Sequence, residues 1–150
     1  MSDIIEYVVR VSPDGTKQWF LNGELHREDG PAVEWPDGSK QWFLYGKKHR
    51  EDGPAVEWPD GSKWWFLNGK LHREGGPAVE WADGSKWWHL HDKLHREGGP
   101  AFEHSNGSKR WFLNGKEYSE SEWKKKTNKK QTCDGKLIEI DGKRYKLVEI

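Results

Sequence analysis

The residues that could do chemistry are repeated along the chain. A His-Arg-Glu triplet begins at His26, His49, His72 and His95, one period of 23 residues apart. A histidine beside a carboxylate can act as a general base. Catalytic residues are normally assembled once, however, and equivalent histidines two strands apart would be about 10 Å from one another, too far to share a proton or a metal ion. We therefore expect a structural role, in which each His stacks on a paired Trp while Arg and Glu form a solvated ladder of weak ion pairs.

A second histidine group is not repeated. His89 and His91 are two residues apart, which places both on one face of a strand, and His104 follows nearby. Zinc sites usually add cysteine or clustered carboxylates to histidine, and neither is present here. We expect no catalytic residues, no metal and no cofactor, although the sequence leaves open a metal bound by these three histidines. The group is also the only non-repeated polar cluster on which an enzyme could be built, and no known catalytic motif accompanies it.

The remaining candidates for recognition are aromatic and basic side chains. Tryptophan can stack on sugars, nucleobases or cations, and Trp, Tyr and Arg are common anchors of protein interfaces. The predicted partner-binding residues are Trp35, Phe43, Trp58, Trp64, Phe66, Arg73, Trp81, Trp87 and Arg96. A sheet that curls would bury these rings instead. A basic run could contact phosphates or an acidic partner, or form a solvated helix face, and it comprises Lys124, Lys125, Lys126, Lys129 and Lys130.

A repeat must position these residues. The same 23-residue period separates Trp19, Trp42, Trp65, Trp88 and Trp111. A fixed period of this size indicates stacked supersecondary units that cannot bury their faces alone. Each unit holds two turn signals: Pro36-Asp37-Gly38 predicts a type I turn followed by a left-handed glycine, and Asn22-Gly23 predicts a two-residue hairpin turn. The sequence therefore predicts an antiparallel meander of short strands.

The turns predict the register of the strands. Across the Pro-Asp-Gly turn Glu34 should face Lys40, and across the Asn-Gly turn Trp19 should face His26. The opposite-charge pair recurs in later units as Glu57/Lys63, Glu80/Lys86 and Glu103/Lys109.

Strand alternation divides each unit between two faces. One face carries side chains whose types recur nearly unchanged, namely Ala32, Trp42, Leu44 and His49. The other face varies between copies and carries Val33, Trp35, Gln41 and Phe43. We interpret the uniform face as the stacked interior and the variable face as an exposed aromatic strip edged by charges.

Composition limits the class of protein. The chain has 150 residues, is 33% hydrophobic and contains 11 Trp, so a thick aliphatic core is excluded. It has no membrane-length apolar run, no signal pattern and a single cysteine, Cys133, so we expect a cytoplasmic protein without membrane contacts. Residues 1–108 carry a net charge of -5 and residues 109–150 a net charge of +5. A nucleic-acid partner is expected only through the basic C-terminal helix.

The C-terminal region predicts a cap. Ser119 and Glu122 have the spacing of a capping box, which indicates a helix over about 119–130 whose Trp123 would plug the end of the array. Residues 136–150 predict a hairpin that pairs Glu139 with Arg144. The predicted fold is all-β, an elongated antiparallel β-hairpin repeat array in a single layer over 1–118, starting with a half-repeat at 8–23, followed by a cap over 119–150. Its open N-terminal edge could pair with a second copy.

The repeat resembles the MORN-repeat family, and more closely its bacterial and viral variants. The residues that carry the resemblance are Asn68-Gly69-Lys70-Leu71-His72 and Asp83-Gly84-Ser85, in a 23-residue unit that covers roughly residues 8–118. The Arg-Glu-Asp-Gly-Pro segment departs from the family's more glycine-rich middle, which bears on the local register. The resemblance implies elongated hairpin arrays that act as scaffolds or binding surfaces, some of them antitoxin or immunity components and others from phages or large viruses.

We expect a non-enzymatic protein-binding module. The resemblance implies a phage or bacterial conflict protein that uses the strip to inhibit a host defence enzyme or to neutralise a toxin. The alternative is a small-ligand binder, either a nucleotide sponge or an aromatic cage for choline or carbohydrate, since the hairpins also resemble choline-binding repeats.

Overall fold

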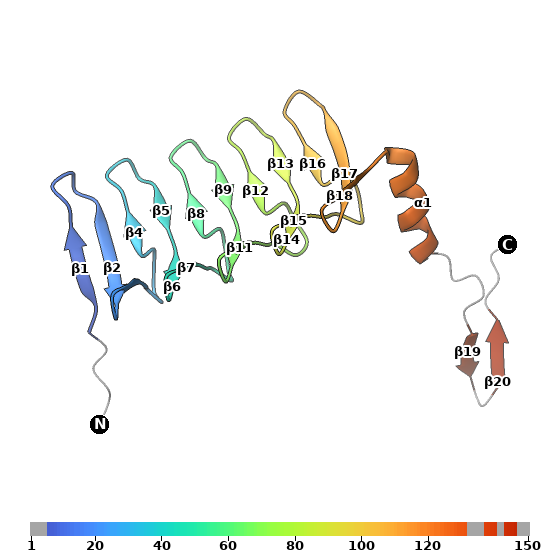
Figure 1. Ribbon diagram of the computed structural model, residues 1–150, viewed down its shortest axis with the longest axis horizontal. Coiled ribbons are helices and arrows are strands. Elements are labelled where there is room, and N and C mark those ends of the chain that lie inside the picture. Colours follow the sequence, from blue (N-terminus) through green and yellow to red (C-terminus); the bar gives the residue numbers. More distant parts are fainter. Residues whose placement is uncertain (1–5, 132–136, 141–142, 147–150) are drawn as a thin grey trace.

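The computed structural model describes residues 6–131, 137–140 and 143–146. It is mostly β: hairpins stand side by side in chain order, and the single helix of the described residues, α1 (Glu120–Gln131), follows the last of them (Figure 1). The predicted fold class is confirmed, because antiparallel hairpins form a long meander and one short helix lies near the C-terminus.

One 12-stranded sheet runs the length of the array. Its strands are β1 (Val8–Val11), β2 (Lys17–Leu21), β3 (Glu24–Leu25), β4 (Val33–Glu34), β5 (Lys40–Gln41), β8 (Val56–Glu57), β9 (Lys63–Trp64), β12 (Val79–Glu80), β13 (Lys86–Trp87), β16 (Phe102–Glu103), β17 (Lys109–Leu113) and β18 (Lys116–Tyr118). Neighbouring strands in this sheet are neighbours in the sequence apart from the small hairpins that intervene, so the sheet contains no long crossover.

Three small hairpins lie along the lower side of the sheet in Figure 1. They are β6 (Phe43–Leu44) with β7 (Lys47–Lys48), β10 (Phe66–Leu67) with β11 (Lys70–Leu71), and β14 (His89–Leu90) with β15 (Lys93–Leu94). A 23-residue unit therefore contains one hairpin of the large sheet and one small hairpin. We number the complete units as residues 32–54, 55–77 and 78–100, preceded by residues 8–31, in which Val9 and Arg10 stand where the complete units have Ala and Val, and followed by the incomplete unit 101–118.

The predicted register is confirmed. Glu34 pairs with Lys40, and the corresponding pairs recur in each later unit. Trp35 donates its N–H to Ser39 O at 3.0 Å, and Gly38 has a φ of 92°. These features are those of a three-residue loop that needs a left-handed last residue. Asn22 and Gly23 have φ of 51° and 84°, as a two-residue turn with two left-handed positions requires.

The core is a narrow spine of small side chains. Each complete unit buries the Val that begins its first strand and the Ala before it, and Ala32, Val33, Ala55, Val56, Ala78 and Val79 are all at most 2% exposed. Ala32 and Val33 point to opposite faces of the sheet. A single layer has no second layer to cover either face, so the larger rings on both faces lie half-buried over this spine.

The expected division into an interior face and an exposed face is therefore wrong. Val33 on the variable face is as buried as Ala32 on the uniform face. Trp35 on the variable face and Trp42 on the uniform face are both half-buried.

The C-terminal end of the array is closed as predicted. Ser119 and Glu122 exchange hydrogen bonds, Ser119 N–H to Oε2 at 3.0 Å and Glu122 N–H to Oγ at 3.3 Å, which is the capping box. Trp123 is 8% exposed, and its Nε1 donates to Arg96 O at 3.0 Å. The helix thereby covers the end of the last unit.

The terminal hairpin pairs Glu139 with Arg144, as expected, through β19 (Leu137–Ile140) and β20 (Lys143–Lys146). The turn between these strands and the residues at 132–136 and 147–150 fall outside the described residues. The hairpin forms its own two-stranded sheet, and α1 rather than the hairpin follows β18.

Candidate binding surface

The variable face carries a continuous chain of ring contacts that crosses three units. Trp58 lies 6.1 Å from Trp64, Trp64 lies 5.3 Å from Trp81, and Trp81 lies 5.7 Å from Trp87, each measured between ring centroids. These three contacts are edge-to-face, whereas Phe102 stacks on Trp87 at 5.4 Å and 29°. We call these five residues the aromatic strip. Phe66 borders it, 6.5 Å from Trp64.

The strip arises from strand pairing. Val56 pairs with Trp64, Val79 pairs with Trp64 and with Trp87, and Phe102 pairs with Trp87. A row perpendicular to the strands thus alternates buried valine with tryptophan. Trp58 and Trp81 directly follow β8 and β12, next to the turns, and their rings contact the tryptophans of this row edge to face. Small buried residues between the large rings let neighbouring indoles contact one another across unit boundaries.

The strip is half-buried, not exposed as the sequence analysis expected. The rings shield one another through their edge-to-face contacts. The indole Nε1 atoms of Trp64, Trp81 and Trp87 are sealed from solvent and have no hydrogen-bond partner among the described residues. The part of each ring that meets solvent therefore offers carbon edges and π faces rather than a donor.

A shallow hollow opens on this face. It encloses about 530 Å³ and is lined by Trp58, Pro59, Asp60, Ser62, Trp64 and Trp81. Trp58 and Trp64 belong to one unit, and Trp81 belongs to the next. The Asp60 carboxylate at its rim accepts the Ser62 N–H at 2.8 Å, which fixes the turn beside the hollow.

Two of the predicted binding aromatics lie outside the chain of rings. Trp35 and Phe43, in the first complete unit, make no ring–ring contact within residues 6–131. The reason is Gln41, which occupies the position that Trp64 and Trp87 occupy in the following units. Sequence reasoning also missed Phe102, which extends the strip, because the corresponding position in the other units is a buried valine.

The predicted binding arginines face the other way. Arg73 lies over Trp65 with Cζ 3.9 Å from the ring centroid, and Arg96 lies over Trp88 at 3.8 Å. Arg73 Nη1 also donates to Glu80 Oε1 at 2.8 Å. Both arginines thus stabilise the uniform face and are not part of the strip.

The expectation that His stacks on Trp is therefore wrong, because Arg takes that place. The paired backbones are as predicted: His26 donates its N–H to Trp19 O at 3.0 Å. Its ring instead accepts a bond from the next unit, since Tyr45 donates its N–H to His26 Nδ1 at 3.1 Å.

The three unrepeated histidines are separated. Within residues 6–131, 137–140 and 143–146, no group of three or more His, Cys, Asp or Glu could hold a metal ion. His89 is buried 6.4 Å from Trp87, where burial lowers its pKa despite the opposing effects of Asp92 and a backbone bond. His91 lies against His72 at 4.2 Å, and His104 lies against Phe102 at 6.2 Å.

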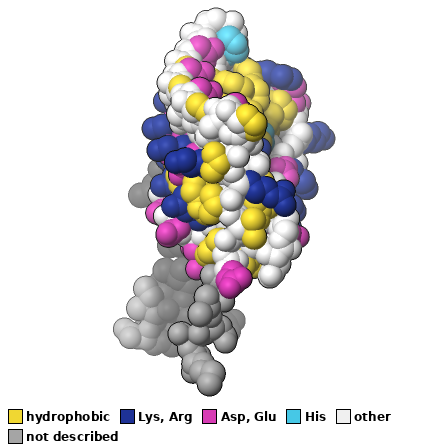
Figure 2. All heavy atoms as spheres, turned by 90° about the vertical axis from the view of Figure 1, so that its left-hand side faces the viewer, with side chains coloured by type: hydrophobic (Ala, Val, Ile, Leu, Met, Phe, Trp, Pro, Cys, Tyr) yellow, Lys and Arg dark blue, Asp and Glu magenta, His cyan; other side chains and the backbone are white. Residues whose placement is uncertain are grey.

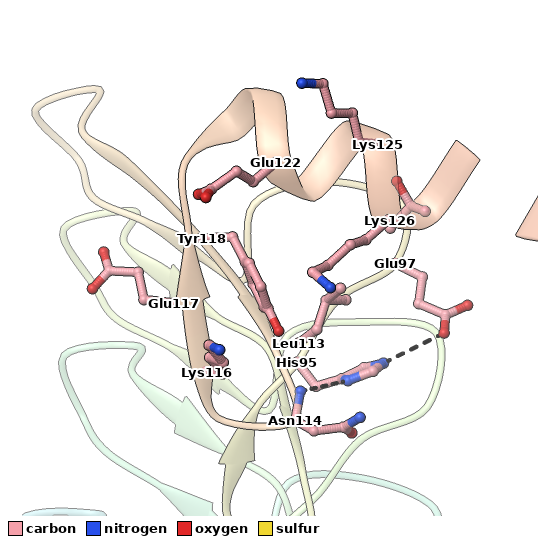
Figure 3. A pocket seen from close by; sticks show the side chains of 11 residues that line it. His95, Glu97, Leu113, Asn114, Lys116, Glu117, Tyr118, Glu122, Lys125 and Lys126 are labelled. Atoms are coloured by element: carbon pink, nitrogen blue, oxygen red, sulfur yellow. Dashed lines mark hydrogen bonds and ion pairs between the residues drawn. The ribbon is translucent and has the colours of Figure 1, made fainter. Parts of the chain in front are cut away.

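The lysines of the basic run differ in their contacts. Lys124 pairs with Glu120 at 2.6 Å, and Lys126 Nζ lies 5.2 Å from the Tyr118 ring. Lys126 belongs to a groove of about 1080 Å³ between α1 and the last unit (Figure 3). Acidic side chains line the same groove, among them Glu97 and Glu122, so its charge is mixed. Lys129 and Lys130 lie in α1.

The comparisons with known proteins give no identity. No protein-family model matches the chain, and no curated protein matches it. Among the described residues, no helix is long and apolar enough to cross a bilayer.

Proposed function

We propose that this chain is a non-enzymatic protein-binding module whose contact surface is the aromatic strip. The observation that carries the proposal is the unbroken series of ring contacts from Trp58 to Phe102 across three units. Half-buried aromatic side chains held by their neighbours lose little side-chain entropy when a partner covers them, and such residues dominate the energetics of interfaces.

The chemistry of the strip favours an apolar or cationic partner surface. Sugar binding needs hydrogen bonds as well as ring stacking, but the Nε1 donors of Trp64, Trp81 and Trp87 are sealed. The accessible ring edges and faces can pack against aliphatic or aromatic side chains, or bind an arginine or lysine through cation–π contact. An open face that extends over several units also suits a protein better than a molecule that must be enclosed.

The resemblance to variant MORN repeats extends the proposal to biology. The chain would act as a phage or bacterial conflict protein that binds a host defence enzyme or a toxin in the cytoplasm. Identification of the partner tests this extension.

The test replaces two rings with the residue that the array itself uses elsewhere. Gln41 stands at the same position as Trp64 and Trp87, so Trp64→Gln/Trp87→Gln should keep the fold and remove the centre of the strip. Tagged wild type and variant are used for affinity purification from the cells that produce the chain, followed by quantitative mass spectrometry. The wild type should enrich a protein that the variant recovers at least about tenfold less well.

A matched control changes the opposite face. Lys63 and Lys86 precede the two tryptophans in their strands and point to the uniform face, so Lys63→Gln/Lys86→Gln should leave recovery unchanged. Equal recovery of the same protein by wild type and the Trp variant, with both folded by circular dichroism, would refute the proposal.

A small ligand is the second candidate, and the hollow between Trp58, Trp64 and Trp81 is the observation that favours it. Its aromatic walls and the Asp60 carboxylate at the rim fit an organic cation such as a choline group. Native mass spectrometry with choline, nucleotides and oligosaccharides separates the two functions. A ligand adduct that Trp64→Gln abolishes would favour the small-ligand function.

A further inference from the structure

The two ends of the array differ in a way that points to self-association. The C-terminal end is closed by α1, whose Trp123 is buried against the last unit. The N-terminal end is the edge strand β1, which among the described strands pairs only with β2. An uncovered edge strand offers free backbone donors and acceptors to another chain.

Exposed apolar side chains gather at this open edge. Five large hydrophobic side chains are exposed among the described residues, and four of them belong to β1 or the residue before it: Tyr7 at 37%, Val8 at 55%, Val9 at 48% and Val11 at 64%. Figure 2 looks onto this end and shows apolar side chains grouped among basic and acidic ones. Edge strands that do not pair with another chain usually carry charged residues that discourage such pairing. The only charged residue in β1 is Arg10.

The direction of the free backbone groups follows from the hydrogen bonds. Ser12 donates its N–H to Thr16 across the first turn, so Ser12 and every second residue before it face β2. Trp19, the partner of Val9, donates its N–H away from β1 to Ala32. Tyr7, Val9 and Val11 therefore direct their backbone N–H and C=O groups to the free edge.

We propose that two copies of this chain pair antiparallel through β1 about a two-fold axis at Val8. In this register Tyr7 and Val9 of the two copies exchange backbone hydrogen bonds. Val8 faces Val8, and Glu6 of each copy faces Arg10 of the other. Val8 and these charged pairs occupy the closely spaced, non-hydrogen-bonded positions, where cross-strand side chains interact most.

Charge complementarity selects this register and a second copy as the occupant. Within residues 6–131 neither Glu6 nor Arg10 has an ion-pair partner, and Arg10 only lies over Phe20 at 4.6 Å. An axis at Arg10 would place like charges opposite each other, and an axis at Val9 would place Val8 opposite Arg10. Because α1 closes the other end, pairing through β1 gives a closed dimer rather than a filament.

The dimer would join the variable faces of the two arrays. Phe20 pairs with Val8, so the row would run from Phe20 through both Val8 residues to Phe20 of the second copy. This inference is independent of the proposed partner, because it uses the edge of the sheet and not the aromatic strip.

Sedimentation velocity over a concentration series tests the pairing. The wild type should reach twice the monomer mass of 17.6 kDa at high concentration. Glu6→Arg and Arg10→Glu should each weaken association about tenfold, and the double swap Glu6→Arg/Arg10→Glu should restore it to within about twofold. A wild type that stays monomeric at its solubility limit would overturn the proposal, as would a double swap that fails to restore association.

The variant Val9→Pro tests the backbone pairing without changing any charge. Val9→Pro deletes an outward N–H and leaves the bonds between β1 and β2 intact, so it should be monomeric. Its unfolding midpoint should equal that of the wild type at concentrations where both are monomers. A dimer that persists in Val9→Pro would show that another surface is used. A monomeric Val9→Pro combined with a double swap that does not recover would instead assign the edge to a different occupant, such as the C-terminal segment of another copy, and would overturn the β1–β1 register.

Discussion

Tyr45 and His26 join two units of the array. The Tyr45 N–H donates to His26 Nδ1 at 3.1 Å, and the two rings meet edge to face at 4.3 Å. The same backbone bond crosses the three later unit boundaries, from Asn68 to His49, from His91 to His72 and from Asn114 to His95. An imidazole can accept through Nδ1 only when that nitrogen carries no proton. The repeated histidine is thus a joint between units, which is a structural reason for it to recur in every unit.

His26→Leu should lower the free energy of unfolding by about 1–3 kcal/mol, because it leaves the Tyr45 N–H without its acceptor beside the buried position of the His26 ring. Urea unfolding followed by tryptophan fluorescence measures the loss. His104→Leu is the control, since the His104 ring is exposed and bonds only within its own turn. Its effect should stay within about 0.5 kcal/mol. Equal losses of stability in both variants would contradict the role of His26 as a joint between units.

Gly99→Ala should destabilise the array where Gly98→Ala does not. A Cβ at Gly99 would stand 3.1 Å from Cζ of Arg96, whose guanidinium lies over Trp88, whereas a Cβ at Gly98 meets no atom within 4 Å. We expect Gly99→Ala to cost about 1 kcal/mol because the Arg96 guanidinium, which lies over Trp88 and bonds to Glu103, must shift, and Gly98→Ala to be neutral or slightly stabilising. Thermal unfolding of the two variants gives the comparison. Equal midpoints would show that Arg96 moves without cost.

Local features of this fold could be predicted from the sequence. Asn22-Gly23 and Pro36-Asp37-Gly38 fix their turns through residues that tolerate positive φ, and a turn fixes the pairing of the strands on either side. The capping box of Ser119 and Glu122 is equally local. Such features depend on residue type and spacing alone, so the hairpins, their register and the helix could be predicted from this one sequence.

The burial of each face could not be predicted in the same way. Alternation separates Val33 from Ala32, but it does not say that a single layer buries both beneath larger rings. Arg73 rather than His72 lies over Trp65, and the His72 ring instead accepts the His91 N–H of the next unit. This contact joins residues 19 positions apart, so strand alternation within one unit does not predict it. The aromatic strip was predicted by residue type, but its extent depends on Gln41, which interrupts the row, and on Phe102, which continues it.

Ser85→Ala and Ser39→Ala make a matched pair, because both side chains are buried beside a turn aspartate and only one hydroxyl bonds to the next unit. Ser85 Oγ accepts the Ser105 N–H of the next unit at 3.0 Å. Ser39 Oγ cannot accept such a bond, because the corresponding residue of the next unit is Pro59, which has no N–H. Ser85→Ala should therefore cost about 1 kcal/mol more in urea unfolding than Ser39→Ala. A larger loss for Ser39→Ala would contradict this assignment.

Acid should weaken the array through its turn aspartates. The backbone N–H of Ser39 holds the pKa of Asp37 below its ordinary value of 3.8, and the Ser85 N–H does the same for Asp83. A carboxyl whose pKa is lowered in the folded state contributes stability above its unfolded pKa and loses it as the pH falls through the folded pKa. The contribution of these aspartates to the urea midpoint should therefore be constant near neutral pH and be lost as the pH drops below about 4.

The variant Asp37→Asn/Asp83→Asn separates these two groups from the other carboxylates with lowered pKa, among them Asp52 and Glu117. Asn106 shows that an amide can replace the carboxylate, because its Oδ1 accepts the Ser108 N–H at 2.9 Å in the last turn of the array. The variant should fold at neutral pH and show a shallower acid decline in its urea midpoint than the wild type. Parallel declines would mean that the turn aspartates carry none of the pH dependence.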